Sequence, residues 1–312
     1  MDKRRLAGTD LDVSVICYGP MRLAQKEDDP DLAQHLAAMH MALDRGVNFI
    51  HSSYEYGVRW MMHRVLKEHP KRHDLLHVIK APVPDWDDDG FDPVKFEARI
   101  DEALRDLCTD RIALVQWMWR SRPHDEATRL PRLAAIKDHV AETALRLQEK
   151  GKLGHLGCFP YFPRSAAAAM ADPAQRVLIA YYNPLETEMS PVIDQMQTDG
   201  RGFLAIRPLY EGVLTDRYPS HDAVPDGHRL AAAKYADAFA FRAALARAVP
   251  EAAAGMTRFA IRFPLMSPHC ASVIVGLSTA DQVTQICEMA QGVVADPDTV
   301  AQVRALSHKS ST

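Results

Sequence analysis

The feature of this sequence that most constrains its fold is a repeated alternation between short β-type apolar runs and longer amphipathic runs. Eight short runs have the character of strands, at residues 13–18, 47–51, 76–80, 112–119, 153–158, 177–182, 203–208 and 272–276. Helical patterns lie between them, at residues 31–45, 58–68, 92–107, 136–150, 164–171, 190–199 and 230–263. Eight strands with intervening helices predict an α/β fold, a (β/α)8 or TIM barrel.

The start of the chain and its overall organisation support the barrel. Residues 4–13 predict an N-terminal β-hairpin that turns near Thr9 and Asp10. The alternative is a doubly wound open sheet, but Gly19-Pro20-Met21 follows the first strand where such a sheet carries Gly-x-Gly-x-x-Gly. Because no Gly/Ser-rich or Pro-rich linker divides the chain, we expect one domain over residues 1–312.

Charge and composition exclude several classes of partner. The net charge is -4, and the lysines and arginines are scattered, so we expect no nucleic-acid partner. No apolar run approaches the ~20 residues of a membrane span, and residues 1–6 are charged with no apolar stretch behind them. The five cysteines have no paired spacing that would hold a metal. We therefore expect a cytoplasmic protein with a small-molecule substrate and no metal.

Polar side chains close several of the predicted strands. His51 ends the second strand and leads to Tyr56, Lys80 ends the third strand, and Arg207 ends the seventh. Functional groups of a (β/α)8 barrel come from the C-terminal ends of its strands. These residues are therefore the first candidates for a site.

Seven short motifs follow one another in a fixed order along the chain. They are Arg5-Leu6 with Val13-Ser14, Gly19-Pro20-Met21, residues 46–50, Tyr56-Gly57, residues 104–112, residues 151–157 and residues 272–276. Each is weak alone, but together and at these separations they resemble the aldo-keto reductase superfamily over nearly the whole chain. The resemblance implies a catalytic barrel that acts on carbonyl compounds.

The resemblance also implies a catalytic tetrad of aspartate, tyrosine, lysine and histidine. The tyrosine falls on Tyr56 and the lysine on Lys80, whereas His51 stands at the aspartate position and Met118 at the histidine position. With an imidazole in place of the carboxylate, we expect Lys80 to lose its anionic neighbour and to favour the neutral amine. A neutral lysine can act as a base or form a Schiff base, and His51 would carry protons.

The cofactor contacts implied by the resemblance are changed at both ends. Phe159-Pro160 and Ile179 stand where family members bind the nicotinamide carboxamide, and Ile206 stands where an aromatic ring stacks. Residues 263–303 contain no lysine or arginine for a 2′-phosphate. We therefore expect no cofactor, with NADP or NAD as the alternative. If a dinucleotide binds, Met21, Arg207 and Ser278 are the expected contacts.

Aromatic and long side chains near the strand ends predict the substrate pocket. The candidates are Trp117, Met118, Trp119, Phe159, Tyr182 and Arg207. The aromatic residues can equally be core. Arg207 is costly to bury without an anion, so it either pairs with Glu186, Glu188 or Glu211 or binds a substrate carboxylate or phosphate.

Three functions follow from these residues. The first is non-redox acid-base chemistry on a small carbonyl compound, an elimination, isomerisation or cyclisation carried out by Tyr56, Lys80 and His51. The second is NAD(P)H-dependent carbonyl reduction with Tyr56 as the proton donor. The third is a non-catalytic binding or regulatory subunit in which Tyr56 and Lys80 are relics. The sequence identifies neither the substrate nor the oligomeric state.

Overall fold

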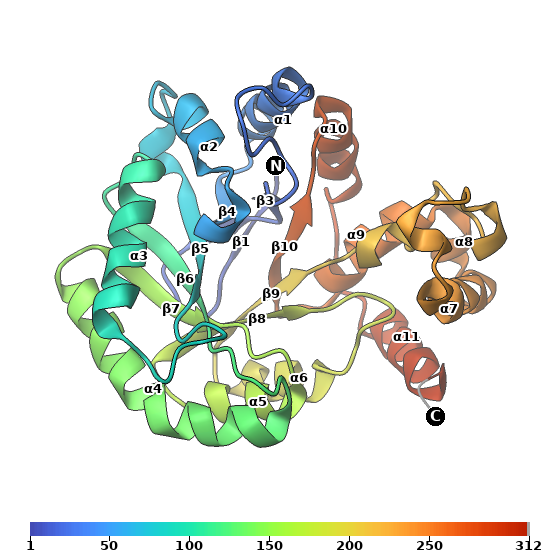
Figure 1. The fold of residues 1–312 in the computed structure, drawn as a ribbon. Coiled ribbons are helices and arrows are strands. Elements are labelled where there is room, and N and C mark those ends of the chain that lie inside the picture. Colours follow the sequence, from blue (N-terminus) through green and yellow to red (C-terminus); the bar gives the residue numbers. More distant parts are fainter. Residues whose placement is uncertain (311–312) are drawn as a thin grey trace.

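The barrel is built from eight parallel strands that close on themselves. The computed structural model describes residues 1–310, and Figure 1 shows the strands at the centre with helices around them. The strands are β3 (Ile16–Gly19), β4 (Phe49–Ser53), β5 (Leu76–Pro82), β6 (Ile112–Met118), β7 (Leu153–Cys158), β8 (Gln175–Tyr181), β9 (Gly202–Ile206) and β10 (Cys270–Gly276). They pair in chain order, and β10 returns to pair with β3. The predicted (β/α)8 barrel is confirmed.

A two-stranded antiparallel hairpin precedes the barrel, as predicted. It joins β1 (Lys3–Arg5) to β2 (Asp12–Ser14). Apolar side chains of the hairpin, among them Leu6 and Leu11, pack with the inward-facing residues of the strands. The hairpin is also tied to β7, because Asp10 lies 2.6 Å from the ring of His155.

Helices cover the outside of the barrel. They are α1 (Leu32–Asp44), α2 (Arg59–Leu66), α3 (Pro93–Asp106), α4 (Glu126–Glu149), α5 (Pro163–Met170), α6 (Ser190–Thr198), α7 (Ala236–Ala248), α8 (Pro250–Ala254), α9 (Met256–Met266), α10 (Ala280–Met289) and α11 (Pro297–Ser310). Short 3₁₀ turns are η1 (Tyr54–Tyr56), η2 (Arg72–Asp74), η3 (Tyr210–Gly212), η4 (His221–Ala223), η5 (Arg229–Ala231) and η6 (Ala233–Tyr235). The caps follow sequence rules: Asp92 accepts from the first backbone amides of α3, and Pro93 opens that helix.

Two predicted helix boundaries are wrong, each for a local reason. The helix expected at 136–150 begins at Glu126, because Asp125 caps it and Pro131 is accommodated inside it. The single helix expected at 230–263 is instead divided into α7, α8 and α9. Pro250 begins α8, and Gly255 separates α8 from α9. This segment projects from one side of the barrel (Figure 1).

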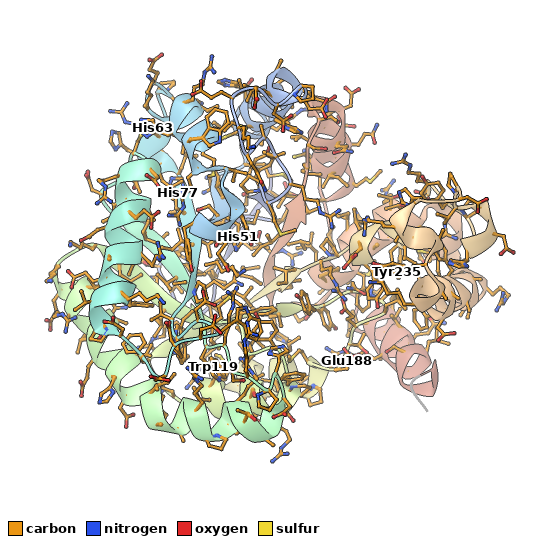
Figure 2. All side chains as sticks on the ribbon, in the orientation of Figure 1. His51, His63, His77, Trp119, Glu188 and Tyr235 are labelled. Atoms are coloured by element: carbon orange, nitrogen blue, oxygen red, sulfur yellow. The ribbon has the colours of Figure 1, made fainter. Side chains whose placement is uncertain are left out.

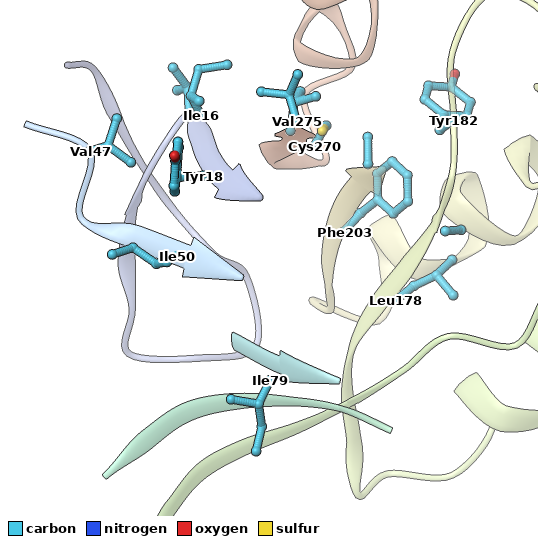
Figure 3. Packing of buried hydrophobic residues seen from close by; sticks show 14 of the residues in the cluster. Ile16, Tyr18, Val47, Ile50, Ile79, Leu178, Tyr182, Phe203, Cys270 and Val275 are labelled. Atoms are coloured by element: carbon cyan, nitrogen blue, oxygen red, sulfur yellow. The ribbon is translucent and has the colours of Figure 1, made fainter. Parts of the chain in front are cut away.

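The alternation of side chains along the strands divides the core into two layers. Inward residues such as Met118, Phe159 and Ile179 form a cluster inside the barrel. Outward residues pack against the helices, and Figure 3 shows part of this outer layer, including Ile50, Ile79 and Tyr182. A residue's position in this alternation therefore decides whether it can reach the barrel interior.

Candidate active site

A cavity of about 580 Å³ opens at the C-terminal ends of the strands. Its lining comprises Gly19, Met21, Arg22, Leu23, His51, Tyr56, Lys80, Gln116, Met118, Phe159, Tyr161, Tyr181, Ile206, Arg207, Pro208, Leu209, Glu211, Gly212, Arg229, Ile274, Val275, Gly276, Leu277, Ser278 and Gln282. The three residues predicted to be catalytic, His51, Tyr56 and Lys80, all lie on this wall, and His51 is near the middle of the barrel (Figure 2).

The turn η1 presents Tyr56 to the cavity. It begins at Ser53, whose side chain accepts a hydrogen bond from the Glu55 amide, and it ends at Gly57 with a φ of 65°. A positive φ suits glycine, so this position sets where the turn stops. Burial raises the pKa of the Tyr56 phenol well above its usual range, and the nearby Glu55 charge adds to the effect. The phenol is therefore protonated at neutral pH.

Lys80 lies beside Tyr56 and is paired with a carboxylate. Its Nζ is 5.5 Å from the centre of the Tyr56 ring and 2.7 Å from Glu55 Oε2. The expectation that Lys80 loses its anionic neighbour is wrong: His51 on β4 is not a carboxylate, but Glu55 supplies one four residues later. The Lys80 and Glu55 side chains are only 16% and 24% exposed, so the pair is shielded from solvent.

Glu55 also binds a second cation, Arg120, which the sequence analysis did not single out. Arg120 Nη2 is 2.7 Å from Glu55 Oε1, and Arg120 Nη1 is 2.6 Å from Asp85 Oδ1. Burial alone would raise the pKa of Glu55, but hydrogen bonds and charge from Lys80 and Arg120 outweigh it and lower that pKa. Lys80, Glu55, Arg120 and Asp85 thus form a chain of alternating charges beside the cavity.

His51 is a neutral group in this site. Burial lowers the pKa of its imidazole to about 4. Its Nε2 is 2.8 Å from Gln116 Oε1, which can only accept, so Nε2 carries the hydrogen and Nδ1 is the bare nitrogen. The ring centres of His51 and Tyr56 are 5.9 Å apart. His51 is therefore a hydrogen-bonded neutral imidazole close to the phenol.

Three predicted substrate residues lie outside the cavity. Trp117 and Trp119 stack on each other in the outer layer, where Trp117 Nε1 donates to Val83 O at 2.7 Å. Tyr182 packs against Phe263 in the same layer. All three have the outward parity of their strands: Trp117 lies on β6, and Trp119 and Tyr182 directly follow β6 and β8.

The cavity is lined instead by inward-facing residues next to these three in the sequence and by residues at the ends of nearby strands. Gln116 and Met118 on β6 line the cavity, as do Phe159, Tyr161 and Tyr181. Phe159 contacts the two tyrosines edge to face, at centroid distances of 4.6 and 5.1 Å. The sequence signal that would have found Gln116 and Tyr181 is the two-residue period counted from the inward Met118 on β6 and Ile179 on β8.

Arg207 stands at the far side of the cavity and is paired on the protein's own carboxylates. Both its Nε and Nη2 bind Glu186, the first at 3.0 Å, and its Nη1 is 3.7 Å from Glu211. Its guanidinium also lies 4.4 Å from the Tyr181 ring centre. The backbone of Arg207 is left-handed, with a φ of 62°, a conformation uncommon outside glycine and concentrated at functional loops. Both carboxylates belong to the three that the sequence offered as partners.

One arm of the cavity runs to the start of α10. Ser278 and Gln282 line it, and Ser278 donates from both its amide and its hydroxyl to Gln282 Oε1. Arg22 and Arg229 line the cavity together with the exposed Met21. Guanidinium groups and a helix N-terminus are the groups that bind phosphate oxygens. The cavity thus has arginines outside residues 263–303, of which Arg229 is paired with Glu211 at 2.7 Å.

Two further properties bear on the class of protein. Among residues 1–310, no helix is both long and apolar enough to cross a bilayer. Within the same described part of the chain, no group of three or more His, Cys, Asp or Glu side chains is placed to hold a metal ion.

Comparison with known proteins places this geometry in a family. Residues 15–308 match the family described as the aldo/keto reductase family. The chain is 24% identical to the L-galactose dehydrogenase of Arabidopsis thaliana, covering 98% of this chain and 94% of that protein. It is 23% identical to the uncharacterized oxidoreductase YqkF of Bacillus subtilis (strain 168), covering 98% and 95%.

Solved structures share the fold at low sequence identity. The aldo-keto reductase AKR11C1 of Bacillus halodurans, in its holo form, superposes with a TM-score of 0.76 at 20% identity, covering 98% of this chain and 96% of that chain. The glycerol dehydrogenase AKR11B4 of Gluconobacter oxydans has a TM-score of 0.74 at 19% identity, covering 99% and 95%.

Proposed function

The chain belongs to the aldo/keto reductase family, and we propose that it is an oxidoreductase that interconverts a carbonyl and an alcohol with a nicotinamide dinucleotide. This was the second of the expectations from sequence, and the relatives named as dehydrogenase and oxidoreductase favour it over non-redox chemistry. The observation that carries it is the protonated Tyr56 phenol beside Lys80, on the wall of one cavity that continues to α10.

The residues of the cavity fit a dinucleotide at its phosphate end. Arg207 and Arg229, with Ser278 just before α10, would hold the phosphates, and all three line the same cavity as Tyr56. Such a cofactor supplies hydride when bound. At the nicotinamide end, Phe159 and Ile206 offer apolar surface, while Gln116 is the amide side chain on that wall.

Tyr56 is the proposed general acid. A carbonyl that accepts hydride develops negative charge on its oxygen, and a phenol held in a partly buried site can transfer a proton to it. Lys80 places positive charge near the same oxygen, which favours the developing anion. In the reverse direction the deprotonated Tyr56 would accept the proton of the alcohol, with Lys80 beside it.

The substrate we propose is a small hydroxylated carbonyl compound or the corresponding alcohol. Met118 and Phe159 provide apolar contact, and Gln116, Tyr161 and Tyr181 provide groups able to bind hydroxyls. One relative is named for L-galactose, which is of this class.

A titration of cofactor fluorescence tests the proposal. NADPH and NADH are added separately to the protein, and energy transfer from protein to cofactor is followed. We expect saturable binding with a Kd of about 10 μM or below, about -7 kcal/mol. The oxidation of a panel of sugars and small alcohols with NADP and NAD then identifies the substrate. Absence of binding by either cofactor contradicts the proposal.

A second candidate, non-redox acid-base chemistry, has its own supporting observation. Phe159, Ile179 and Ile206 are the residues at the expected carboxamide and stacking positions, and none has a side chain that can hydrogen-bond. Tyr56 with neutral His51 would then exchange protons with a carbonyl compound. Solvent deuterium incorporation into a substrate without added cofactor would favour this candidate.

A further inference from the structure

The carboxylate that pairs with Lys80 comes from Glu55, four residues after His51. We propose that Glu55 is the residue that binds and positions Lys80, a task that the family resemblance assigns to an aspartate at the position of His51. The inference deepens the proposed function and rests on it for its catalytic consequence, but the geometry that supports it is independent of any reaction.

The contacts of Glu55 are specific to this role. Its two carboxylate oxygens bind different cations, Oε2 to Lys80 and Oε1 to Arg120, each at 2.7 Å. Arg120 is held in turn by Asp85 at 2.6 Å, and its side chain is only 8% exposed. A carboxylate fixed from the far side by a buried, anchored guanidinium cannot turn away from Lys80 without leaving Arg120 partly unpaired.

Position 51 cannot perform this task in the present sequence. His51 is neutral, and its Nε2–H donates a hydrogen bond to Gln116 Oε1. Strand pairing nevertheless keeps position 51 near Lys80. His51 pairs with Val78 on β5, two residues before Lys80, and the side chains of His51 and Lys80 both line the cavity. A carboxylate placed at either position 51 or position 55 therefore has access to the same lysine from different sides.

Glu55 does not touch the reacting end of the cavity. It is absent from the lining residues, whereas Lys80 and Tyr56 are both among them. Its action on the reaction is thus exerted through Lys80, which makes it a positioning residue.

The first test measures Lys80 directly, without any substrate. Trinitrobenzenesulfonate labels an amine more slowly when a carboxylate holds it in an ion pair, so the labelling rate of Lys80 at fixed pH, read by peptide mass spectrometry, reports its pairing with Glu55. We expect Glu55→Gln to label about tenfold faster than the wild type, the change that corresponds to about 1.4 kcal/mol. The control is Glu68→Gln, on the exposed surface beside Lys67, in which Lys80 should be labelled at the wild-type rate. A Glu55→Gln rate within twofold of wild type overturns the proposal.

The second test asks whether the two positions are equivalent. The double variant His51→Asp with Glu55→Gln should bring Lys80 labelling back to within about threefold of wild type, because a carboxylate again faces the amine. A double variant that labels as fast as Glu55→Gln overturns the claim that Glu55 performs the task of position 51. Circular dichroism checks that each variant is folded.

The catalytic readout separates this proposal from the proposed function. Glu55→Gln should lower kcat and shift its pH profile relative to the wild type. If no cofactor-dependent turnover exists in any variant, the proposed function fails while the labelling result still decides the role of Glu55.

Discussion

The Lys80 ammonium lies 5.5 Å from the centre of the Tyr56 ring and is bound on another side by Glu55 at 2.7 Å. Three phenols line the cavity, those of Tyr56, Tyr161 and Tyr181, but this cation is in ring contact with Tyr56 alone of the three. Burial raises the pKa of each phenol. The lysine therefore distinguishes the one phenol that we assign as the acid.

Replacing Tyr56 with phenylalanine should remove the proton donor and keep the ring. We expect kcat for carbonyl reduction to fall by about 10²- to 10⁴-fold, the usual contribution of a general acid. Tyr181→Phe is the matched control, since its phenol lines the same cavity, and it should lower kcat by less than about tenfold. Steady-state kinetics measure both, and equal losses in the two variants would contradict the assignment.

Arg207 should contribute both to stability and to cofactor binding, and the two effects can be separated. Burial raises the pKa of Glu186, and the Arg207 charge opposes this rise. Arg207→Met leaves the Glu186 carboxyl group without its cation, so we expect the free energy of unfolding to fall by about 3–5 kcal/mol. Adding Glu186→Gln should recover most of the loss.

Cofactor affinity should not recover in the double variant. Without the guanidinium, the Kd for NADPH should rise about tenfold or more in both the single and the double variant, since a charge-assisted hydrogen bond is worth roughly 1.5–3 kcal/mol. Denaturant unfolding and fluorescence titration measure the two effects. A double variant with wild-type affinity would show that Arg207 only neutralises Glu186.

The barrel could be predicted from sequence because its strands and helices repeat with distinct periods, and Lys80 and Tyr56 could be found because they close strands or follow them directly. Which face of a strand a residue occupies was harder to infer. Trp117 and Tyr182 attract attention as aromatics, yet the cavity is lined by Gln116 and Tyr181, one position earlier in each case.

The charged chain beside the cavity could not be predicted for a different reason. Glu55 lies in a short 3₁₀ turn, and its contacts with Lys80 and Arg120 join segments separated by 25 and 65 residues. Sequence spacing carries no information on such a contact, because the closure of the barrel creates it. The residue at position 51 alone therefore does not determine the environment of Lys80.

The alternation along β6 can be tested by substituting adjacent residues. Trp117→Phe loses the 2.7 Å hydrogen bond to Val83 O and should lower the free energy of unfolding by about 1–3 kcal/mol, because a buried carbonyl is left unpaired. Its kcat/KM should stay within about twofold of wild type. Met118→Ala should change kcat/KM by about tenfold or more, because it removes a cavity wall. Kinetics in which the Trp117 variant is the more impaired would contradict the placement.

The last prediction concerns acid stability and two buried histidines. Burial lowers the pKa of His51 and of His77 to about 4, from an ordinary value of 6.5. Between pH 6.5 and 4 these histidines bind protons in the unfolded chain but not in the folded chain. The free energy of unfolding is therefore highest above pH 6.5 and decreases as the pH falls. Each histidine should account for about 3 kcal/mol of this loss.

His77→Leu isolates one of the two contributions. Neither ring nitrogen of His77 has a hydrogen-bond partner within the described chain, so leucine should leave stability at pH 7 unchanged or raise it. The advantage of the variant should then grow by about 3 kcal/mol on acidification to pH 4. Urea unfolding at pH 7, 5.5 and 4 measures this growth. The matched control is His139→Leu on the exposed face of α4, which should follow the wild-type pH dependence. If His77→Leu also follows that dependence, His77 takes up its proton in the folded state as readily as in the unfolded one.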